Sequence, residues 1–220
     1  MAKYLIGASD VGRGALAGPL VAAAVLVPVG GNHGDGVQED KMLFQPSWDE
    51  IASKLRQRKD LVWCQGSIAS FAIDTNGMEW ALEEAYIGVI TGCLKHLDIP
   101  DTARVCIDIG NSPRLPQRLL AQSPLTSDKI SIVYQTVNAP FVWEVCAASI
   151  LATTERNSRM QDLAADFPRY GWDTNGGYNT KSHAAAIHDF GLTPHHRSLC
   201  REFLPKEPSC TPLLDLFSGA

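Results

Sequence analysis

Apolar and polar stretches alternate along this chain in an order that predicts strands and helices in turn. Five short apolar runs predict strands, at residues 4–8, 20–29, 61–73, 103–109 and 130–136. Three longer segments carry apolar residues every three to four positions and predict helices, at residues 48–58, 78–97 and 141–165. Strands that alternate with helices in this way indicate an α/β fold.

Two segments interrupt this alternation. Residues 30–41 are rich in Gly, Asn, His and Asp and predict a loop. Residues 204–212 contain three prolines and predict an extended linker after a domain that spans 1–203. A tail at 213–220 follows the linker and begins with the apolar pentapeptide Leu213–Phe217. An apolar pentapeptide on an extended tail needs a surface to cover it, so the tail predicts a partner.

The net charge of the 220-residue chain is −5 at pH 7, so basic side chains do not dominate its surface. Contact with a nucleic acid would therefore depend on a local cluster of cations and not on the field of the whole molecule. The six cysteines form no Cys-x-x-Cys pair, which favours reduced thiols over a zinc site or a disulfide framework. Because the sequence also has no long apolar run, we expect a soluble cytoplasmic monomer that does not bind a membrane.

The turn between the first two predicted strands carries the most informative motif. It reads Gly7-Ala8-Ser9-Asp10-Val11-Gly12-Arg13-Gly14 and resembles the opening of the type 2 ribonuclease H (ribonuclease HII) family, Gly-x-Asp-Glu-x-Gly-Arg-Gly. Later segments resemble further blocks of that family in the same order: Val105–Asn111, Ala147–Ala152 with Arg156, Gly177–His183 and His196-Arg197. The resemblance implies a ribonuclease H-like mixed sheet flanked by helices, with a small C-terminal helical extension.

The resemblance also implies a two-metal site for phosphodiester hydrolysis, built in the family from four carboxylates. Asp10 and Asp108 fall on two of those positions and are the implied catalytic and metal-binding residues. Ser9 and Ala139 stand at the other two positions, where the family has acids. Two dications about 4 Å apart repel by roughly 17 kcal/mol at an effective dielectric near 20. With two carboxylates instead of four, we expect one weakly bound Mg²⁺ or Mn²⁺ at most, and impaired or lost hydrolysis.

The implied partner is an RNA/DNA hybrid or DNA with embedded ribonucleotides. The backbone of the Gly-Arg-Gly turn implies contact with the 2′-hydroxyl at an RNA-to-DNA junction, because a backbone without Cβ can approach closely. The aromatic face of Tyr178 suits a deoxyribose ring. The implied substrate-binding residues are Gly12, Arg13, Gly14, Tyr178, Thr180 and Lys181.

Other basic and imidazole side chains have weaker signals. Lys41, Lys181 and Arg197 are candidates to neutralise phosphates. Three histidines, His183, His195 and His196, lie in the family's later blocks with no metal-ligand spacing to a carboxylate. We therefore expect these histidines to be structural.

Two alternatives stay open at this point. An active endoribonuclease HII could use a rearranged acid set, in which Asp10 shifts along the strand or Glu144 or Glu155 reaches the site. An interaction protein could retain only the fold. The intact glycine turn and Tyr178 favour nucleic-acid binding, because a bare scaffold has no physical need for them.

The tail segment Leu213–Phe217 resembles the bacterial sliding-clamp pentapeptide Gln-Leu-x-Leu-Phe, with Leu213 at the Gln position. Leu214, Leu216 and Phe217 are the implied partner-binding residues, because Leu and Phe anchors on an extended linker can fill a preformed apolar groove. In the alternative interpretation, the same three side chains fold back onto the domain's own surface.

Overall fold

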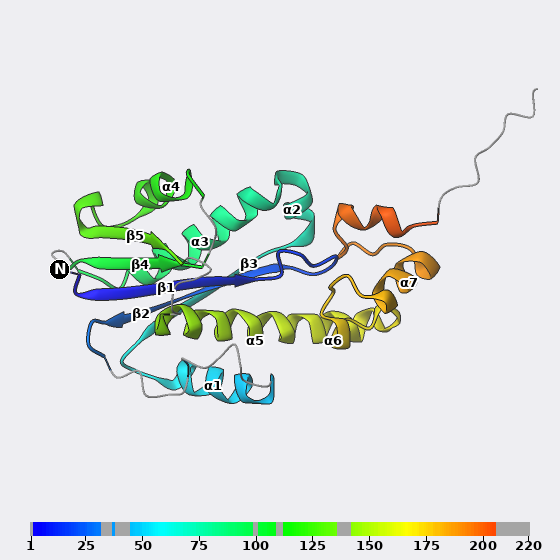
Figure 1. The fold of residues 1–220 in the computed structure, drawn as a ribbon, viewed down its shortest axis with the longest axis horizontal. Coiled ribbons are helices and arrows are strands. Elements are labelled where there is room, and N and C mark those ends of the chain that lie inside the picture. Colours follow the sequence, from blue (N-terminus) through cyan, green and yellow to red (C-terminus); the bar gives the residue numbers. More distant parts are fainter. Residues whose placement is uncertain are drawn as a thin grey trace, which may run out of the picture.

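The computed structural model describes residues 2–31, 37, 45–98, 101–108, 112–135 and 142–205. A five-stranded sheet lies at its centre, in the order β3-β2-β1-β4-β5 (Figure 1). The strands are β1 (Tyr4–Val11), β2 (Leu20–Pro28), β3 (Val62–Ile68), β4 (Ala103–Ile107) and β5 (Ile130–Tyr134). β2 pairs antiparallel with β1 and β3, whereas β4 pairs parallel with β1 and β5. The predicted α/β mixed sheet is therefore confirmed.

Helices cover both faces of the sheet. They are α1 (Gln45–Gln57), α2 (Ser70–Asn76), α3 (Met78–Leu94), α4 (Leu115–Gln122), α5 (Trp143–Asp166), α6 (Trp172–Asn175) and α7 (Lys181–Phe190). Short 3-10 turns occupy Ser127–Lys129, Pro168–Tyr170 and Ser198–Phe203. In Figure 1, α3 and α4 lie on one side of the sheet, and α1 and α5 lie on the other. None of the helices in the described part of the chain is both long and apolar enough to cross a bilayer.

β2 is almost fully buried because helices pack against both of its faces. Its even-numbered residues, Leu20 to Leu26, join the core beneath α3, and its odd-numbered residues, Val21 to Val27, join the core beneath α1 and α5. Side chains on a strand alternate between faces, so a strand covered on both sides becomes a continuous apolar run. The same alternation in β1 places Ile6 and Ala8 on the α3 face.

The start of α5 lies directly against β1 at Gly7. A Cβ on Gly7 would lie 2.1 Å from the carbonyl carbon of Glu144 and 2.3 Å from the backbone nitrogen of Val145. Only glycine, which has no Cβ, allows the backbone of β1 to approach the backbone of α5 this closely. This contact brings the first turn of α5 next to the residues that follow Gly7 on β1.

The far end of α5 belongs to a smaller C-terminal group of helices. A separate apolar cluster joins Leu16, Met160, Trp172, Ile187 and Cys200. The glycine-rich segment after β1 is part of this cluster, because Ala15 bridges to Tyr178 and Ala17 bridges to His196. The predicted C-terminal helical extension is therefore packed against the turn between β1 and β2.

Several predicted boundaries need correction. The strand predicted at 61–73 is wrong beyond Ile68, because Ala69 is the last extended residue and α2 begins at Ser70. A short apolar run does not distinguish a strand from a helical turn whose buried residues, Ser70 and Ile73, are three positions apart. α4 was not predicted. Pro116 does not interrupt this helix, because proline is tolerated in the first helical turn.

The other predicted elements differ only at their ends. Strand β1 continues to Val11, and strands β4 and β5 end at Ile107 and Tyr134. Most of the predicted loop at 30–41, and the linker and tail beyond Pro205, lie outside the described residues.

Candidate functional site

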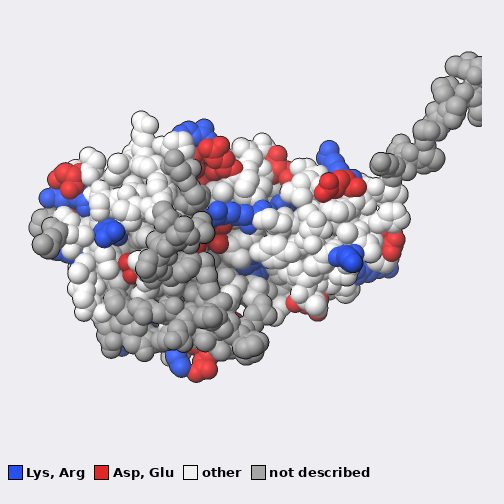
Figure 2. Space-filling model, in the orientation of Figure 1, with Lys and Arg blue, Asp and Glu red and all other residues white. Residues whose placement is uncertain are grey.

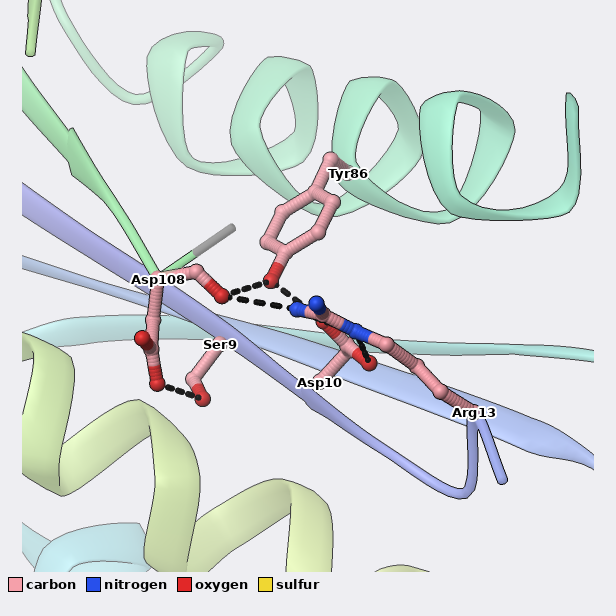
Figure 3. A network of polar contacts seen from close by, with 5 residues as sticks. All are labelled: Ser9, Asp10, Arg13, Tyr86 and Asp108. Carbon is pink, nitrogen blue, oxygen red and sulfur yellow. Dashed lines mark hydrogen bonds and ion pairs between the residues drawn. The ribbon is translucent and has the colours of Figure 1, made fainter. Parts of the chain in front are cut away.

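Ser9 and Asp10 are neighbours on β1, and their side chains point to opposite faces of the sheet. Ser9 faces α5 and donates its hydroxyl proton to Oδ2 of Asp108 across 3.3 Å. Asp10 faces α3 and accepts a hydrogen bond of 2.6 Å from the hydroxyl of Tyr86 (Figure 3). The alternation of side chains along a strand separates the two positions.

The carboxylate of Asp10 is held in an ion pair with Arg13. Nε of Arg13 lies 2.8 Å from Oδ2 and 3.1 Å from Oδ1 of Asp10, and the Asp10 side chain is only 1% exposed. The hydrogen bond to Asp10 raises the pKa of the Arg13 guanidinium above its ordinary value. Burial, followed by the Asp10 charge, raises the pKa of the Tyr86 hydroxyl, so Tyr86 remains a proton donor.

Asp108 presents different atoms to the two faces. Its backbone nitrogen donates to the carbonyl oxygen of Ala8 across 2.9 Å, which fixes the residue at the end of β4. Its carbonyl oxygen accepts from Nη2 of Arg13 at 2.8 Å and from Tyr86 at 3.1 Å. The guanidinium of Arg13 therefore lies among oxygens of Asp10 and Asp108, while the Asp108 carboxylate turns toward Ser9 (Figure 3).

In the described residues, this donor set offers a pair of divalent ions no cluster of free carboxylates. Among the described residues, no group of three or more His, Cys, Asp or Glu side chains could hold a metal. The Asp10 carboxylate is already paired with a cation, and the Asp108 carboxylate faces away from it. Ala139 lies outside the described residues, so the position of the fourth predicted ligand is not tested.

The two acids of the alternative set lie in different surroundings. Glu155 accepts from Nε of Arg159 across 2.8 Å along α5. Glu144 is 7% exposed in the first turn of α5. Burial, then the charge of Glu144 and more weakly that of Asp108, raises the pKa of the Cys106 thiol to about 11. Of the two alternative acids, Glu155 is therefore paired along its own helix and Glu144 is buried.

The Gly-Arg-Gly turn contains one glycine that the fold requires and one that it leaves open. Gly12 has a φ of +99°, and a Cβ there would lie 2.5 Å from Nε of Arg156 and 2.8 Å from the carbonyl oxygen of Pro19. Gly14 is exposed, and a Cβ there would meet no atom within 4 Å. A side chain introduced at Gly14 would therefore contact no other described part of the protein, and it would contact only a molecule bound to the turn.

Tyr178 lies beside this turn, and Thr180 and Lys181 follow it at the start of α7. The backbone nitrogens of Leu16 and Ala17 both donate to the carbonyl oxygen of Gly177, at 2.8 and 3.0 Å. The Tyr178 ring is 37% exposed and lies 4.9 Å from the guanidinium carbon of Arg156. The Thr180 hydroxyl caps α7 by accepting from the backbone nitrogen of His183, and Lys181 is exposed. The fold brings Tyr178 next to the Gly-Arg-Gly turn, and the role of the predicted substrate-binding residues stays a prediction.

Arg197 is not a surface cation, so its predicted contact with phosphate is wrong. The side chain is fully buried, and it donates to the carbonyl oxygens of Arg13 at 2.9 Å and Gly18 at 3.0 Å. Lys41, the other candidate besides Lys181, lies outside the described residues. On the face shown in Figure 2, basic side chains are scattered singly or in small groups among acidic ones.

The histidines form a buried structural chain. Nε1 of Trp172 donates to Nε2 of His183 across 2.9 Å, and Nε2 of His196 lies 3.2 Å from the same nitrogen. Nδ1 of His196 accepts from the backbone nitrogen of Thr193 at 2.9 Å. Burial, then the neighbouring histidines, lowers the pKa of His196 to about 4. Both rings are therefore neutral at pH 7 and hold the C-terminal helices together.

Sequence reasoning missed two residues of this region. Tyr86 lies inside the apolar period of α3, and no motif distinguishes it from an ordinary core tyrosine. Arg156 is recognised only as part of a family block, although it donates to the carbonyl oxygens of Ala17, Pro19 and Gly176. A buried arginine cannot be told from an exposed one by sequence position alone.

Comparison with known proteins finds relatives that match most of the chain. The profile of the Ribonuclease HII family matches residues 6–203. Ribonuclease HII of Ehrlichia ruminantium (strain Welgevonden) is 32% identical over 195 residues, which cover 88% of this chain and 84% of the relative. Ribonuclease HII of Paracoccus denitrificans (strain Pd 1222) is 32% identical over 206 residues, which cover 93% of this chain and 86% of the relative.

Solved structures share the fold at lower identity. Ribonuclease H2 of Pyrococcus horikoshii OT3 has a TM-score of 0.71 at 19% identity, with 91% of this chain and 96% of that chain covered. A chain of the PCNA:RNase HII complex from Archaeoglobus fulgidus has a TM-score of 0.70 at 22% identity, with 93% and 98% covered. Bst-RNase HIII in complex with Mn²⁺ has a TM-score of 0.64 at 16% identity, with 86% and 64% covered.

Proposed function

The chain belongs to the ribonuclease HII family, and from this membership we propose that it binds RNA/DNA hybrids or DNA with embedded ribonucleotides while its two-metal hydrolysis is impaired or lost. The observation that carries the proposal is the Arg13–Asp10 ion pair beside an intact glycine turn. The turn supports binding, and the ion pair opposes the metal site.

The binding half of the proposal is supported by shape. Gly14 leaves open space where a Cβ would be, which is what a close approach of a sugar to the backbone requires. The half-exposed ring of Tyr178 lies beside the same turn and offers an apolar face to a deoxyribose. The exposed Lys181 supplies a cation locally, as a chain with a net charge of −5 requires.

The impaired-hydrolysis half is supported by charge. Ribonucleases of this family use divalent metal ions, and a relative of the fold, Bst-RNase HIII, has been solved with Mn²⁺. In this chain Arg13 supplies one positive charge against the two negative charges of Asp10 and Asp108, where two divalent ions need several carboxylates. A cation would have to displace the guanidinium before it could use the Asp10 carboxylate.

The test is a pair of duplexes that differ only in one ribonucleotide, with binding followed by fluorescence anisotropy in EDTA and in Mg²⁺. We expect the ribonucleotide duplex to bind more tightly in both conditions. Cleavage should be at least about a thousand-fold slower than that of a four-acid relative, since this factor corresponds to about 4 kcal/mol of lost transition-state stabilisation. Equal affinity for both duplexes across salt concentrations would favour the alternative of an interaction protein that retains only the fold.

The active-enzyme alternative has one observation in its favour, the buried Glu144 on the α5 side of the sheet. Efficient Mg²⁺- or Mn²⁺-dependent cutting at equal enzyme would contradict impairment. If Glu144→Gln then abolished that cutting without unfolding the protein, the rearranged acid set would replace our proposal.

We further propose a sliding clamp as the partner of the tail. The archaeal relative in the PCNA:RNase HII complex supports a clamp partner for this fold. The Leu214, Leu216 and Phe217 anchors support it from the sequence. Docking on a clamp would bring the domain to newly replicated DNA, where embedded ribonucleotides occur.

A further inference from the structure

Two guanidinium groups lie inside the protein beneath the glycine-rich turn. Arg156 is 1% exposed and Arg197 is 0% exposed. Neither makes an ion pair with a carboxylate of the described residues. Both instead donate to backbone carbonyl oxygens: Arg156 to Ala17, Pro19 and Gly176, and Arg197 to Arg13 and Gly18. Five carbonyl groups on two separate loops are therefore turned toward two buried cations.

This arrangement is unfavourable for the cations themselves. Burial, reinforced by the charge of Arg156, lowers the pKa of Arg197 to about 10, and burial lowers the pKa of Arg156. A buried charge without a counter-ion is costly unless hydrogen bonds compensate for its lost hydration. Apolar side chains could fill the same space without that cost. The guanidinium groups differ from apolar side chains because their hydrogen bonds fix the direction in which the carbonyl groups of the turn point.

The direction of one carbonyl has a consequence at Gly14. The C=O of Arg13 and the N–H of Gly14 belong to one peptide unit, and no peptide bond of the described residues is cis. In a trans peptide the C=O and N–H groups point in opposite directions. Since Nη1 of Arg197 holds the Arg13 carbonyl inward at 2.9 Å, the Gly14 N–H points outward. It makes no hydrogen bond to another described residue.

The outward N–H meets open space. Gly14 is exposed, and no atom lies within 4 Å of the position of a Cβ on it. The guanidinium of Arg13 is held by the Asp10 carboxylate. An N–H donor on an uncovered turn suits a small acceptor oxygen that comes close to the backbone.

We propose that Arg197 is a positioning residue for ribonucleotide recognition, which holds the Arg13 carbonyl inward so that the Gly14 N–H donates to the 2′-hydroxyl oxygen of the substrate. The proposal rests on the proposed function. It assigns junction selectivity to a buried residue that touches no substrate, and it leaves the general affinity for duplexes to the exposed cations.

The experiment compares the selectivity ratio, the affinity for a duplex with one ribonucleotide divided by the affinity for the all-DNA duplex, in EDTA. In Arg197→Gln we expect the ratio to fall at least ten-fold toward unity, while affinity for the all-DNA duplex stays within two-fold. Arg197→Lys keeps the charge but not the fork of two donors, so it should lose selectivity as well. A ratio that stays at the wild-type value in folded variants would overturn the proposal.

The matched control is Trp172→Phe. Trp172 is as buried as Arg197 and lies in the same C-terminal cluster, but its hydrogen bond goes to His183 and not to the turn. This variant should lose thermal stability and keep the wild-type ratio. If it lost the ratio to the same extent, selectivity would follow stability alone and Arg197 would be merely structural. If the wild-type protein showed no preference at all, the proposed function itself would fail.

A second measurement uses only wild-type protein, so it tests the proposal even if the variants do not fold. The amide signal of Gly14 is followed by NMR during titration with the ribonucleotide duplex, with the all-DNA duplex, and with a ribonucleotide duplex that carries a neutral methylphosphonate beside the ribose. The proposal expects a shift specific to the ribose in the first and third titrations. A shift that disappears with the methylphosphonate would assign the contact to phosphate and overturn the role of the 2′-hydroxyl.

Discussion

Ser9 donates a hydrogen bond to the Asp108 carboxylate on the face of the sheet opposite Asp10. A serine satisfies one carboxylate oxygen of the half-buried Asp108 without adding a further negative charge. An aspartate at the same position would place two carboxylates within a few ångströms of each other. Without a cation, the two carboxylates would repel each other. With a divalent ion between them, both could bind that ion.

The first prediction follows from this geometry. Ser9→Asp should lower the free energy of unfolding by about 1–4 kcal/mol in EDTA, because two like charges near 4 Å repel by roughly that amount. Mn²⁺ should restore the stability of the variant and leave the wild-type protein unchanged. Thermal unfolding with and without Mn²⁺ measures both effects, and Ser9→Asn is the uncharged control.

The first prediction extends to activity, because we expect cleavage only when the second missing acid is added as well. Ser9→Asp with Ala139→Asp should cut a ribonucleotide duplex faster than either single variant, because carboxylates of a two-metal site act as a unit. If the double variant folded, bound two ions and still did not cut, missing charge would not explain the loss of hydrolysis.

The second prediction contrasts two glycines of the turn. Gly12→Ala should destabilise the protein by about 1–3 kcal/mol, because its positive φ and the adjacent Arg156 leave no room for a Cβ. Gly14→Val should change stability by less than about 0.5 kcal/mol and remove the preference for the ribonucleotide duplex. Urea unfolding and anisotropy measure the two properties. A Gly14→Val variant that keeps its preference would place the substrate elsewhere.

The third prediction concerns acid stability. The pKa of His196 is lowered to about 4 in the folded protein, whereas that of an unfolded histidine is about 6.5. The unfolded chain therefore binds more protons between these values, so stability falls as the pH drops from about 6.5 to 4. The loss is on the order of 3 kcal/mol. Urea unfolding of wild-type and His196→Gln proteins across this range should show that the free energy of unfolding depends less on pH in the variant. If both proteins showed the same pH dependence, His196 would not be the cause of the loss of stability.

The fourth prediction concerns the thiols. Cys64 on β3 is partly exposed, and a hydrogen bond from Cys93 together with nearby Lys95 lowers its pKa. Iodoacetamide reacts with thiolates, so Cys64 should be alkylated before the buried Cys93, Cys106, Cys146 and Cys200. Peptide mapping after brief alkylation at pH 7 measures the order. Cys93→Ala should slow the alkylation of Cys64. An unchanged rate would show that Cys93 does not lower the pKa of Cys64.

The fifth prediction concerns the tail. A bacterial sliding clamp should bind the full chain with micromolar affinity, about −8 kcal/mol, because Leu213 replaces the glutamine of the motif. A variant with Leu216→Ala and Phe217→Ala should lose that binding. Titration calorimetry measures both, with duplex binding by the domain as the control that the variant is folded. Indistinguishable or absent binding for both chains would remove the clamp from the proposal.

The sequence is sufficient for the fold but only partly for the site. The central strands are predictable because β2, buried on both faces, is an unbroken apolar run. The resemblance of two sequence blocks to the family implies Asp10 and Asp108 as the two acids. The motif does not reveal that Ser9 and Asp10 face opposite sides. That separation depends on which helix covers which face. Arg197 is misjudged because charged residues are usually exposed, and only tertiary contacts reveal its burial.

The hydrogen bond between Arg197 and the carbonyl oxygen of Arg13 joins residues 184 positions apart. Chains are synthesised from the N-terminus, and their domains begin to fold before synthesis ends. The strands of the sheet can pair while the chain is still on the ribosome, but the turn at residues 12–19 waits for Arg197, among the last residues of the domain to emerge. If Arg197 positions the turn as we propose, the nascent protein acquires its sheet first and its preference for the ribonucleotide last, and incomplete chains would not compete for ribonucleotide sites.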